Sequence, residues 1–222
     1  MRTITNTVIP IVVFFSTVVI GLFVFKNLSK SKDKVLMGKS SILTHHKLPL
    51  KKNTMHRDDK LPKIADEVQE FSKIKGYNKQ IAFLIDMSIP SGQNRFFVYN
   101  MDKDSIEQAA LVTHGYGSSI NEIEFSNVSG SYCTSLGKYK VGAAYQGRFG
   151  LAYKLYGLDK TNDKAFERFI VLHSHDCVPE EEVAPQTICE SQGCPTVSPA
   201  FLKTLEKYLA ASNKPIVLNI YK

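Results

Sequence analysis

The apolar residues of this chain occur in three spacings, and each spacing predicts a different kind of element. The first is an unbroken run, because Val8 to Phe25 is 18 residues long and carries no charge. A helix that crosses a bilayer needs about 17–25 such residues. We therefore predict a short tail at 1–7 and a transmembrane signal anchor at 8–25. A cleaved signal peptide is the alternative, but no small residues at the spacing of a cleavage site follow the run.

The second spacing is that of an amphipathic helix. Residues 62–75 carry apolar side chains three or four positions apart from Ile64 to Ile74, with a proline in the first turn and Gly76 after the end. Such prolines and glycines commonly mark the two ends of a helix. Ser198 and the proline after it begin another segment of this kind, as N-cap and first residue. We predict two or three helices besides the membrane span.

The third spacing is that of strands. From residue 80 onward, short runs rich in Val, Ile, Phe and Tyr alternate with turn residues such as Pro, Gly, Asn and Asp. Runs of this kind predict strands joined by hairpins and loops. The predicted strands are 81–87, 95–99, 106–114, 138–142, 151–156, 168–173 and 215–221. Residues 61–222 are therefore predicted to form one mainly β domain, a mixed barrel or sandwich, that the helix at 62–75 leads into.

The net charge of +7 is concentrated in one segment. Residues 26–60 hold ten Lys or Arg and three Asp or Glu, so the remainder of the chain is nearly neutral. A protein that binds duplex nucleic acid carries a basic face on its folded domain, so nucleic acid is not an expected partner. Residues 26–60 also lack a sustained apolar period, which predicts a basic flexible stalk. Its lysines are either solvated or in contact with anionic headgroups beside the span.

Reactive side chains gather near the end of the chain. An apolar run leads into His173, and Gly193 allows a sharp turn just before Cys194. A thiol beside a histidine and exposed backbone N–H groups is the layout of a cysteine nucleophile. The imidazole would take the thiol proton, and N–H groups at the glycine turn could stabilise the oxyanion. His175 is an alternative base, and His114, which follows another apolar run, could line the same cleft.

The same stretch also contains enough ligands for a zinc ion. They are His173, His175, Asp176, Cys177, Cys189 and Cys194. The run His-Ser-His-Asp departs from the H-x-H-x-D-H pattern of metallo-hydrolases, because its Asp comes one place early, so we predict no metal and no other cofactor. If the domain lies outside the cytoplasm, Cys177 and Cys189 could instead form a disulfide that braces the loop over the site.

A resemblance to a known family rests on three stretches of sequence. His173-Ser174 at the end of an apolar strand, then Ser191-Gln192-Gly193-Cys194, resembles the L,D-transpeptidase catalytic domain (YkuD-like), which carries H-G or H-S and then S-x-G-C. Thr134–Val141 is similar to the T-P-T-G-x-[FY]-x-[IV] stretch of that family, and Leu111–Gly115 to the strand and turn before it. The resemblance covers roughly residues 80–221.

The resemblance implies a fold of the L,D-transpeptidase catalytic type and a transferase that acts on peptidoglycan stem peptides. Cys194 would form the acyl-enzyme and His173 would be the base. Gly193, Ser191 and Ser174 would support the oxyanion site or the loop. What orients the imidazole is open, since a backbone carbonyl and Ser174 are equally plausible partners.

One departure from the common pattern of the family concerns an arginine. After the cysteine this chain has Pro195 and Thr196, which is similar to the murein L,D-transpeptidase subgroup with S-x-G-C-P, whereas the common form has an arginine there. Arg148 and Arg168 are candidates for binding the substrate carboxylate in its place.

The predicted location follows from this activity. A domain that acts on peptidoglycan must lie outside the cytoplasm, anchored in the membrane through residues 8–25. The lysines just after the span favour the opposite orientation under the positive-inside tendency, and we give function the greater weight. Two alternatives remain, namely an L,D-carboxypeptidase or amidase that uses water as acceptor, and a non-catalytic peptidoglycan-binding module.

Overall fold

The structure, a computed structural model, describes residues 60–117 and 122–222. The predicted tail, the signal anchor and the stalk up to residue 59 lie outside the described residues. No helix within the described ranges is long and apolar enough to cross a membrane.

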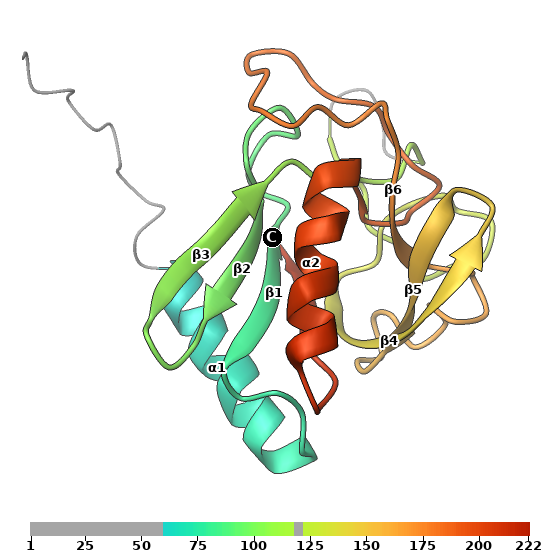
Figure 1. Ribbon diagram of the computed structural model, residues 1–222. Coiled ribbons are helices and arrows are strands. Elements are labelled where there is room, and N and C mark those ends of the chain that lie inside the picture. Colours follow the sequence, from blue (N-terminus) through green and yellow to red (C-terminus); the bar gives the residue numbers. More distant parts are fainter. Residues whose placement is uncertain (1–59, 118–121) are drawn as a thin grey trace, which may run out of the picture. The chain divides into compact units, whose positions relative to one another are not determined.

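The described residues form a mixed eight-stranded sheet with two helices (Figure 1), with the strand order β3-β2-β1-β8-β4-β5-β6-β7. The elements are α1 Lys60–Lys75, β1 Ile81–Asp86, β2 Phe96–Asn100, β3 Ser105–Ala110, β4 Gly137–Gly147, β5 Gly150–Gly157, β6 Val171–Ser174, β7 Thr196–Val197, α2 Pro199–Ala211 and β8 Val217–Tyr221. Two neighbouring pairs, β1 with β8 and β6 with β7, are parallel, and the other pairs are antiparallel. The prediction of a mainly β domain is confirmed. Of the two or three helices predicted, two lie in the described residues, and the strands form one sheet, not the two sheets of a sandwich.

The centre of the sheet is buried on both faces, which explains its continuous apolar runs. In β1, Phe83 and Ile85 belong to the core that includes the apolar residues of α2. The alternate residues Ala82 and Leu84 belong to a second core that includes those of α1. Successive side chains of a strand point to opposite faces, so a strand with a helix on each face must be apolar at every position.

Helix α1 begins at Lys60 and ends at Lys75, close to the predicted range of 62–75. Its buried residues are Leu61, Ala65, Val68 and Ser72. Ile74, which the apolar stripe predicted to face the domain, is 78% exposed. The buried face of α1 is therefore rotated relative to the predicted apolar stripe, and Ile74 in the last turn lies outside that face.

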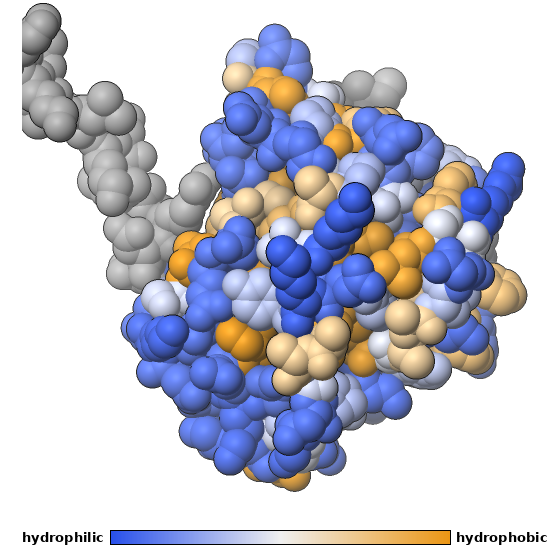
Figure 2. Space-filling view, in the orientation of Figure 1, coloured by the Kyte–Doolittle hydropathy of each residue, from blue (hydrophilic) through white to orange (hydrophobic). Residues whose placement is uncertain are grey.

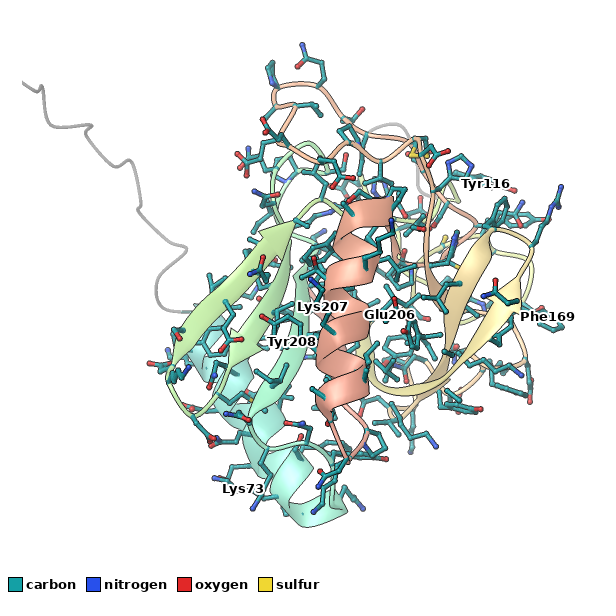
Figure 3. All side chains as sticks on the ribbon, viewed as in Figure 1. Lys73, Tyr116, Phe169, Glu206, Lys207 and Tyr208 are labelled. Carbon is teal, nitrogen blue, oxygen red and sulfur yellow. A yellow bond between two sulfur atoms is a disulfide. The ribbon has the colours of Figure 1, made fainter. Side chains whose placement is uncertain are left out.

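Helix α2 is amphipathic in the way its sequence predicts. Ser198 is its N-cap, and the side chain accepts a hydrogen bond from Phe201 N at 3.2 Å. Much of the surface over α2 is hydrophilic in Figure 2, and its exposed residues include Glu206 and Lys207, which Figure 3 labels. The apolar face of α2 packs onto the sheet beside the edge formed by β6 and β7, where His173 pairs with Thr196.

Candidate active site

A cleft of about 530 Å³ contains both predicted catalytic residues on its wall. It also includes the exposed aromatic residues Tyr116 and Phe169, which Figure 3 shows on the side of the molecule where β5 and β6 lie. The residues that line it are Thr113, Tyr116, Tyr145, Gly147, Arg148, Phe149, Ala152, Phe169, Val171, His173, His175, Cys177, Glu190, Ser191, Gln192, Cys194 and Thr196. Cys194 and His173 therefore lie on the wall of the same cleft.

The turn before Cys194 depends on a glycine for two independent reasons. Gly193 has φ of +106°, a conformation that side chains rarely adopt,. A Cβ at this position would also lie 2.6 Å from the carbonyl oxygen of Cys133. The Gly193 N–H donates to Ser191 Oγ at 3.1 Å, which closes the turn on itself.

Ser191 and Thr113 fix the loop that carries the thiol. Ser191 Oγ lies 2.7 Å from the carbonyl oxygen of Cys194, and Thr113 Oγ1 donates to the same oxygen at 3.1 Å. Thr113 N also donates to Thr196 O at 2.9 Å, and Thr196 N donates to Thr113 Oγ1 at 3.1 Å. Ser191 and Thr113 thus both bond to the carbonyl of Cys194, and Thr113 is a contact that the sequence did not indicate.

The Cys194 thiol bonds to the backbone that leads into β6. Its Sγ accepts from Val171 N at 3.5 Å and donates to Phe169 O at 3.8 Å. Burial raises the pKa of the Cys194 thiol above its ordinary value, and the Val171 N–H and the Arg168 charge oppose this increase. The resting cysteine is therefore a thiol at neutral pH, and its reactivity requires a base.

His173 is held in the tautomer that a base needs. Its Nδ1 lies 3.1 Å from the carbonyl oxygen of Ser174, which can only accept, so Nδ1 carries the proton. Its Nε2 is then an acceptor, and Thr196 Oγ1 donates to it at 3.0 Å. Burial lowers the pKa of His173, the Ser174 carbonyl opposes this effect, and His175 reinforces it. The imidazole is therefore neutral, and a backbone carbonyl orients it.

His175, the alternative base, and His114, the other histidine predicted near the cleft, both have the opposite tautomer. His175 Nδ1 accepts from Cys177 N at 3.1 Å, so its Nε2 carries the proton. His114 Nδ1 lies 3.0 Å from Arg95 Nη2, which can only donate, so again Nε2 is protonated. Burial first, and then the Arg95 charge, lower the pKa of His114 to about 4. Among these three histidines, His173 alone has an unprotonated Nε2. His173 and His175 both line the cleft, whereas His114, which the sequence also placed there, is not among the residues that line it.

An aromatic ring covers the imidazole from the β4–β5 hairpin. Phe149 stacks on His173 with ring centroids 5.3 Å apart and 17° between the planes, and it meets His175 edge-on at 5.6 Å. The neighbouring Arg148 lies over the Phe149 ring at 5.6 Å and lines the cleft. Of the two arginines predicted to bind a substrate carboxylate, Arg148 thus lines the cleft.

Arg168 is placed differently and is not among the residues that line the cleft. Its Nη1 donates to Ser126 O at 2.8 Å, and its Nη2 donates to Cys133 O at 2.7 Å. Further contacts at 3.2 and 3.4 Å reach Ser135 Oγ and Ser131 Oγ. Arg168 therefore holds the 126–135 segment and acts on Cys194 through its charge.

The loop between the two halves of the site is tied down at several points. Cys177 and Cys189 form a disulfide with Cα atoms 6.1 Å apart, as the sequence allowed. Glu180 accepts from Ser198 Oγ at 2.6 Å and Glu182 accepts from Asn94 N at 2.7 Å. The disulfide removes two of the possible zinc ligands. In residues 60–117 and 122–222, no cluster of three or more His, Cys, Asp or Glu could hold a metal ion.

Five residues at or behind the site were missed from the sequence, namely Arg95, Thr113, Phe149, Glu190 and Thr196. Each of them contacts a partner that lies far away in the sequence. Arg95 alone had a visible signal, because it is a charged residue that directly precedes the apolar run of β2.

The family model described as L,D-transpeptidase catalytic domain matches residues 55–218. No curated protein matches the chain.

Solved structures that match the chain include the helical cell shape determining protein Pgp2 from Campylobacter jejuni, with 12% identity, a TM-score of 0.43 and coverage of 64% of this chain and 48% of that chain. An L,D-transpeptidase from Mycobacterium smegmatis has 12% identity, a TM-score of 0.38 and coverage of 64% and 59%. One from Mycobacterium tuberculosis H37Rv has 14% identity, a TM-score of 0.39 and coverage of 64% and 58%. The chain thus spans about half the length of these structures.

Proposed function

Since this chain belongs to the family of L,D-transpeptidase catalytic domains, we propose that it is a cysteine acyltransferase that acts on peptidoglycan stem peptides. The observation that carries the proposal is the arrangement of two side chains on one cleft. The Cys194 thiol and the His173 imidazole both line it, and the Ser174 carbonyl leaves the Nε2 of His173 unprotonated.

The first step is attack of Cys194 on a stem-peptide carbonyl. The raised pKa of Cys194 and the lowered pKa of His173 make the resting pair uncharged, so His173 accepts the thiol proton as the C–S bond forms. This requires the thiol to leave Phe169 O and the Thr196 hydroxyl to turn away from Nε2. Catalytic hydrogen bonds are commonly completed only when substrate is bound.

The oxyanion that forms needs a hydrogen-bond donor near Cys194. The Gly193 N–H is already bonded to Ser191 Oγ. The Cys194 N–H takes part in no hydrogen bond among the described residues, so we assign the oxyanion contact to it. Loss of one such donor costs about 3–4 kcal/mol in comparable enzymes.

Collapse of the tetrahedral intermediate breaks the C–N bond. The leaving amine takes the proton from His173, and the acyl group remains on Cys194 as a thioester. In the second half of the reaction, an amine acceptor attacks the thioester, His173 takes the proton of that amine, and the thiol is regenerated. Water as acceptor gives the carboxypeptidase or amidase outcome instead.

The proposed location is the cell envelope, with anchorage through residues 8–25 and the domain outside the cytoplasm. The Cys177–Cys189 disulfide supports this placement, because disulfides persist in oxidising compartments and are rare in the cytosol. The S-x-G-C-P subgroup also stays a prediction.

Incubation of the protein with a stem tetrapeptide, with and without an acceptor amine, tests the function. Mass spectrometry should show an acyl adduct on Cys194, a transfer product when the amine is present, and neither with Cys194→Ala. Activity retained by Cys194→Ala would refute the mechanism. A hydrolysis product alone, unaffected by the amine, would favour the carboxypeptidase, and an unreactive thiol would favour the binding module.

A further inference from the structure

The cleft contains a carboxylate that the proposed mechanism does not use. Glu190 directly precedes the Ser191–Cys194 loop and lines the cleft, and its side chain is 46% exposed. Its Oε1 lies 3.4 Å from His114 Nε2, which carries a proton, so the imidazole donates to the carboxylate. Two other acidic residues of the loop are placed differently, because Glu180 bonds to the start of α2 and Glu182 bonds to Asn94.

The hydrogen-bond donor behind Glu190 is a neutral imidazole, which brings no positive charge to the carboxylate. Arg95 Nη2 donates to His114 Nδ1 at 3.0 Å, and the pKa of His114 is lowered to about 4. No Lys or Arg within the described part of the chain lies within 4.0 Å of the Glu190 carboxylate. The carboxylate on the wall of the cleft beside the nucleophile therefore has no lysine or arginine of the described residues beside it.

The support for this carboxylate is rigid and buried. Arg95 is 0% exposed, and it also donates to Val112 O at 2.7 and 3.0 Å and to Ile89 O at 3.2 Å. Those contacts fix its guanidinium, which in turn fixes the ring of His114. The contacts from Arg95 through His114 to Glu190 thus run from the interior of the protein to the cleft wall. A glutamate that only faces solvent would not need such a buried support.

A fixed, unneutralised carboxylate in a partly enclosed cleft attracts a cation. The aromatic ring of Tyr116 lines the same cleft, and its backbone N–H bonds to Ser191 O at 2.9 Å. Aromatic faces also favour cations. Arg148, the cation that lines this cleft, comes from the separate β4–β5 hairpin.

We infer that Glu190 binds a side-chain ammonium group of the stem peptide, and that Arg95 and His114 are positioning residues that hold its carboxylate toward the cleft. This assignment rests on the proposed function, since it takes a stem peptide with a diamino acid as the ligand. It makes Glu190 a residue that determines specificity and takes no part in proton transfer.

Calorimetric binding to a Cys194→Ser protein tests the assignment without turnover. The probes are a stem tetrapeptide with lysine at its third position and the same peptide with the lysine amine acetylated. The free amine should bind about two- to fivefold more tightly than the acetylated form, as expected for a half-exposed charge pair. Adding Glu190→Gln should abolish this preference, whereas Glu181→Gln, which removes an exposed carboxylate of the same loop, should preserve it.

If His114 positions Glu190, two substitutions of His114 should affect the preference for the free amine to different extents. His114→Gln can accept from Arg95 and donate to Glu190, so the preference for the free amine should survive. His114→Leu can do neither, so the preference should fall while circular dichroism shows a folded protein. A loss that is equal in both variants would contradict the positioning role.

Failure of this inference can be told apart from failure of the proposed function. Equal affinity for the two peptides, or no binding of either, overturns the role of Glu190. If the wild-type protein forms no acyl-enzyme but the amine preference disappears with Glu190→Gln, the transferase proposal fails and the role of Glu190 stands. If the protein is active and Glu190→Gln leaves the preference unchanged, the role of Glu190 fails and the function stands.

Discussion

Thr196 Oγ1 lies 3.0 Å from His173 Nε2, so a hydroxyl group is hydrogen-bonded to the nitrogen that the proposed base would use to accept a proton. The two residues face each other across the parallel pair of β6 and β7. A donor to Nε2 stabilises the neutral imidazole, because the protonated ring cannot accept that hydrogen bond.

Thr196→Val should therefore raise the pKa of His173. The acidic limb of the kcat/KM profile should move to higher pH by up to about one unit, the equivalent of one hydrogen bond. The pH–rate profile of acyl-enzyme formation measures this shift. Thr204→Val is a matched control, because its hydroxyl donates to Ala200 O on the surface of α2, and it should leave the limb unchanged. An unchanged limb in Thr196→Val would show that the hydroxyl does not act on the base.

The elements could be predicted from sequence where local patterns decide them. The apolar runs of β1, β2 and β8 are buried at every position, and the Ser198 cap begins α2 where its residue type predicts. By contrast, β7 is two residues long and has no period of its own. It exists because Thr196 pairs with His173, a contact that depends on the fold.

The same distinction applies to the site. The nucleophile and base were visible because each stands beside a characteristic neighbour, a glycine turn or an apolar strand. Their supports were not visible, since Arg95 and His114 are separated by 19 residues and Thr113 and Cys194 by 81. Choosing among the three histidines required the partner of each Nδ1, which only the structure supplies.

Acid should weaken the fold through His114. Its pKa is about 4 in the folded protein against an ordinary value of 6.5, so between these values the unfolded state binds more protons. The contribution of neutral His114 to the unfolding free energy is therefore fully present above about pH 6.5 and is lost as the pH decreases toward 4. The loss attributable to His114 is about 2 kcal/mol at pH 4.5, and the lowered pKa of His173 adds to it in the same direction.

Urea unfolding of the wild type and of His114→Gln measures this contribution. The difference in unfolding free energy between pH 7 and pH 4.5 should be smaller in the variant by about 2 kcal/mol. Between pH 7 and pH 8 the two proteins should behave alike, since both states of the histidine are then neutral. An identical acid dependence would show that His114 is not held neutral.

Removal of the Cys177–Cys189 disulfide should affect stability more than chemistry. The bridge closes a loop with a sequence separation of 12, which corresponds to about 3 kcal/mol in the chain-entropy treatment. The double variant Cys177→Ala/Cys189→Ala should unfold at a lower temperature, and reductant should lower the melting temperature of the wild type alone. Some activity should remain, because Glu180 and Glu182 still hold the loop. Complete loss of activity in a folded double variant would mean that the disulfide itself organises the cleft.

Gly193→Ala should damage the site beyond the cost of an unfavourable φ. At Gly193, φ is +106° and an added Cβ would lie 2.6 Å from Cys133 O, a backbone atom that cannot turn aside. Gly76 is the matched control, because its φ is +77° and nothing lies within 4 Å of an added Cβ. Gly76→Ala should therefore cost about 1 kcal/mol in unfolding free energy and leave acyl-enzyme formation unchanged. Gly193→Ala should cost more in urea unfolding and should slow acylation, because relief of the clash must move the Cys194 N–H and Sγ together. Equal stability losses and equal acylation rates in the two variants would show that the close approach to Cys133 does not set the position of the nucleophile.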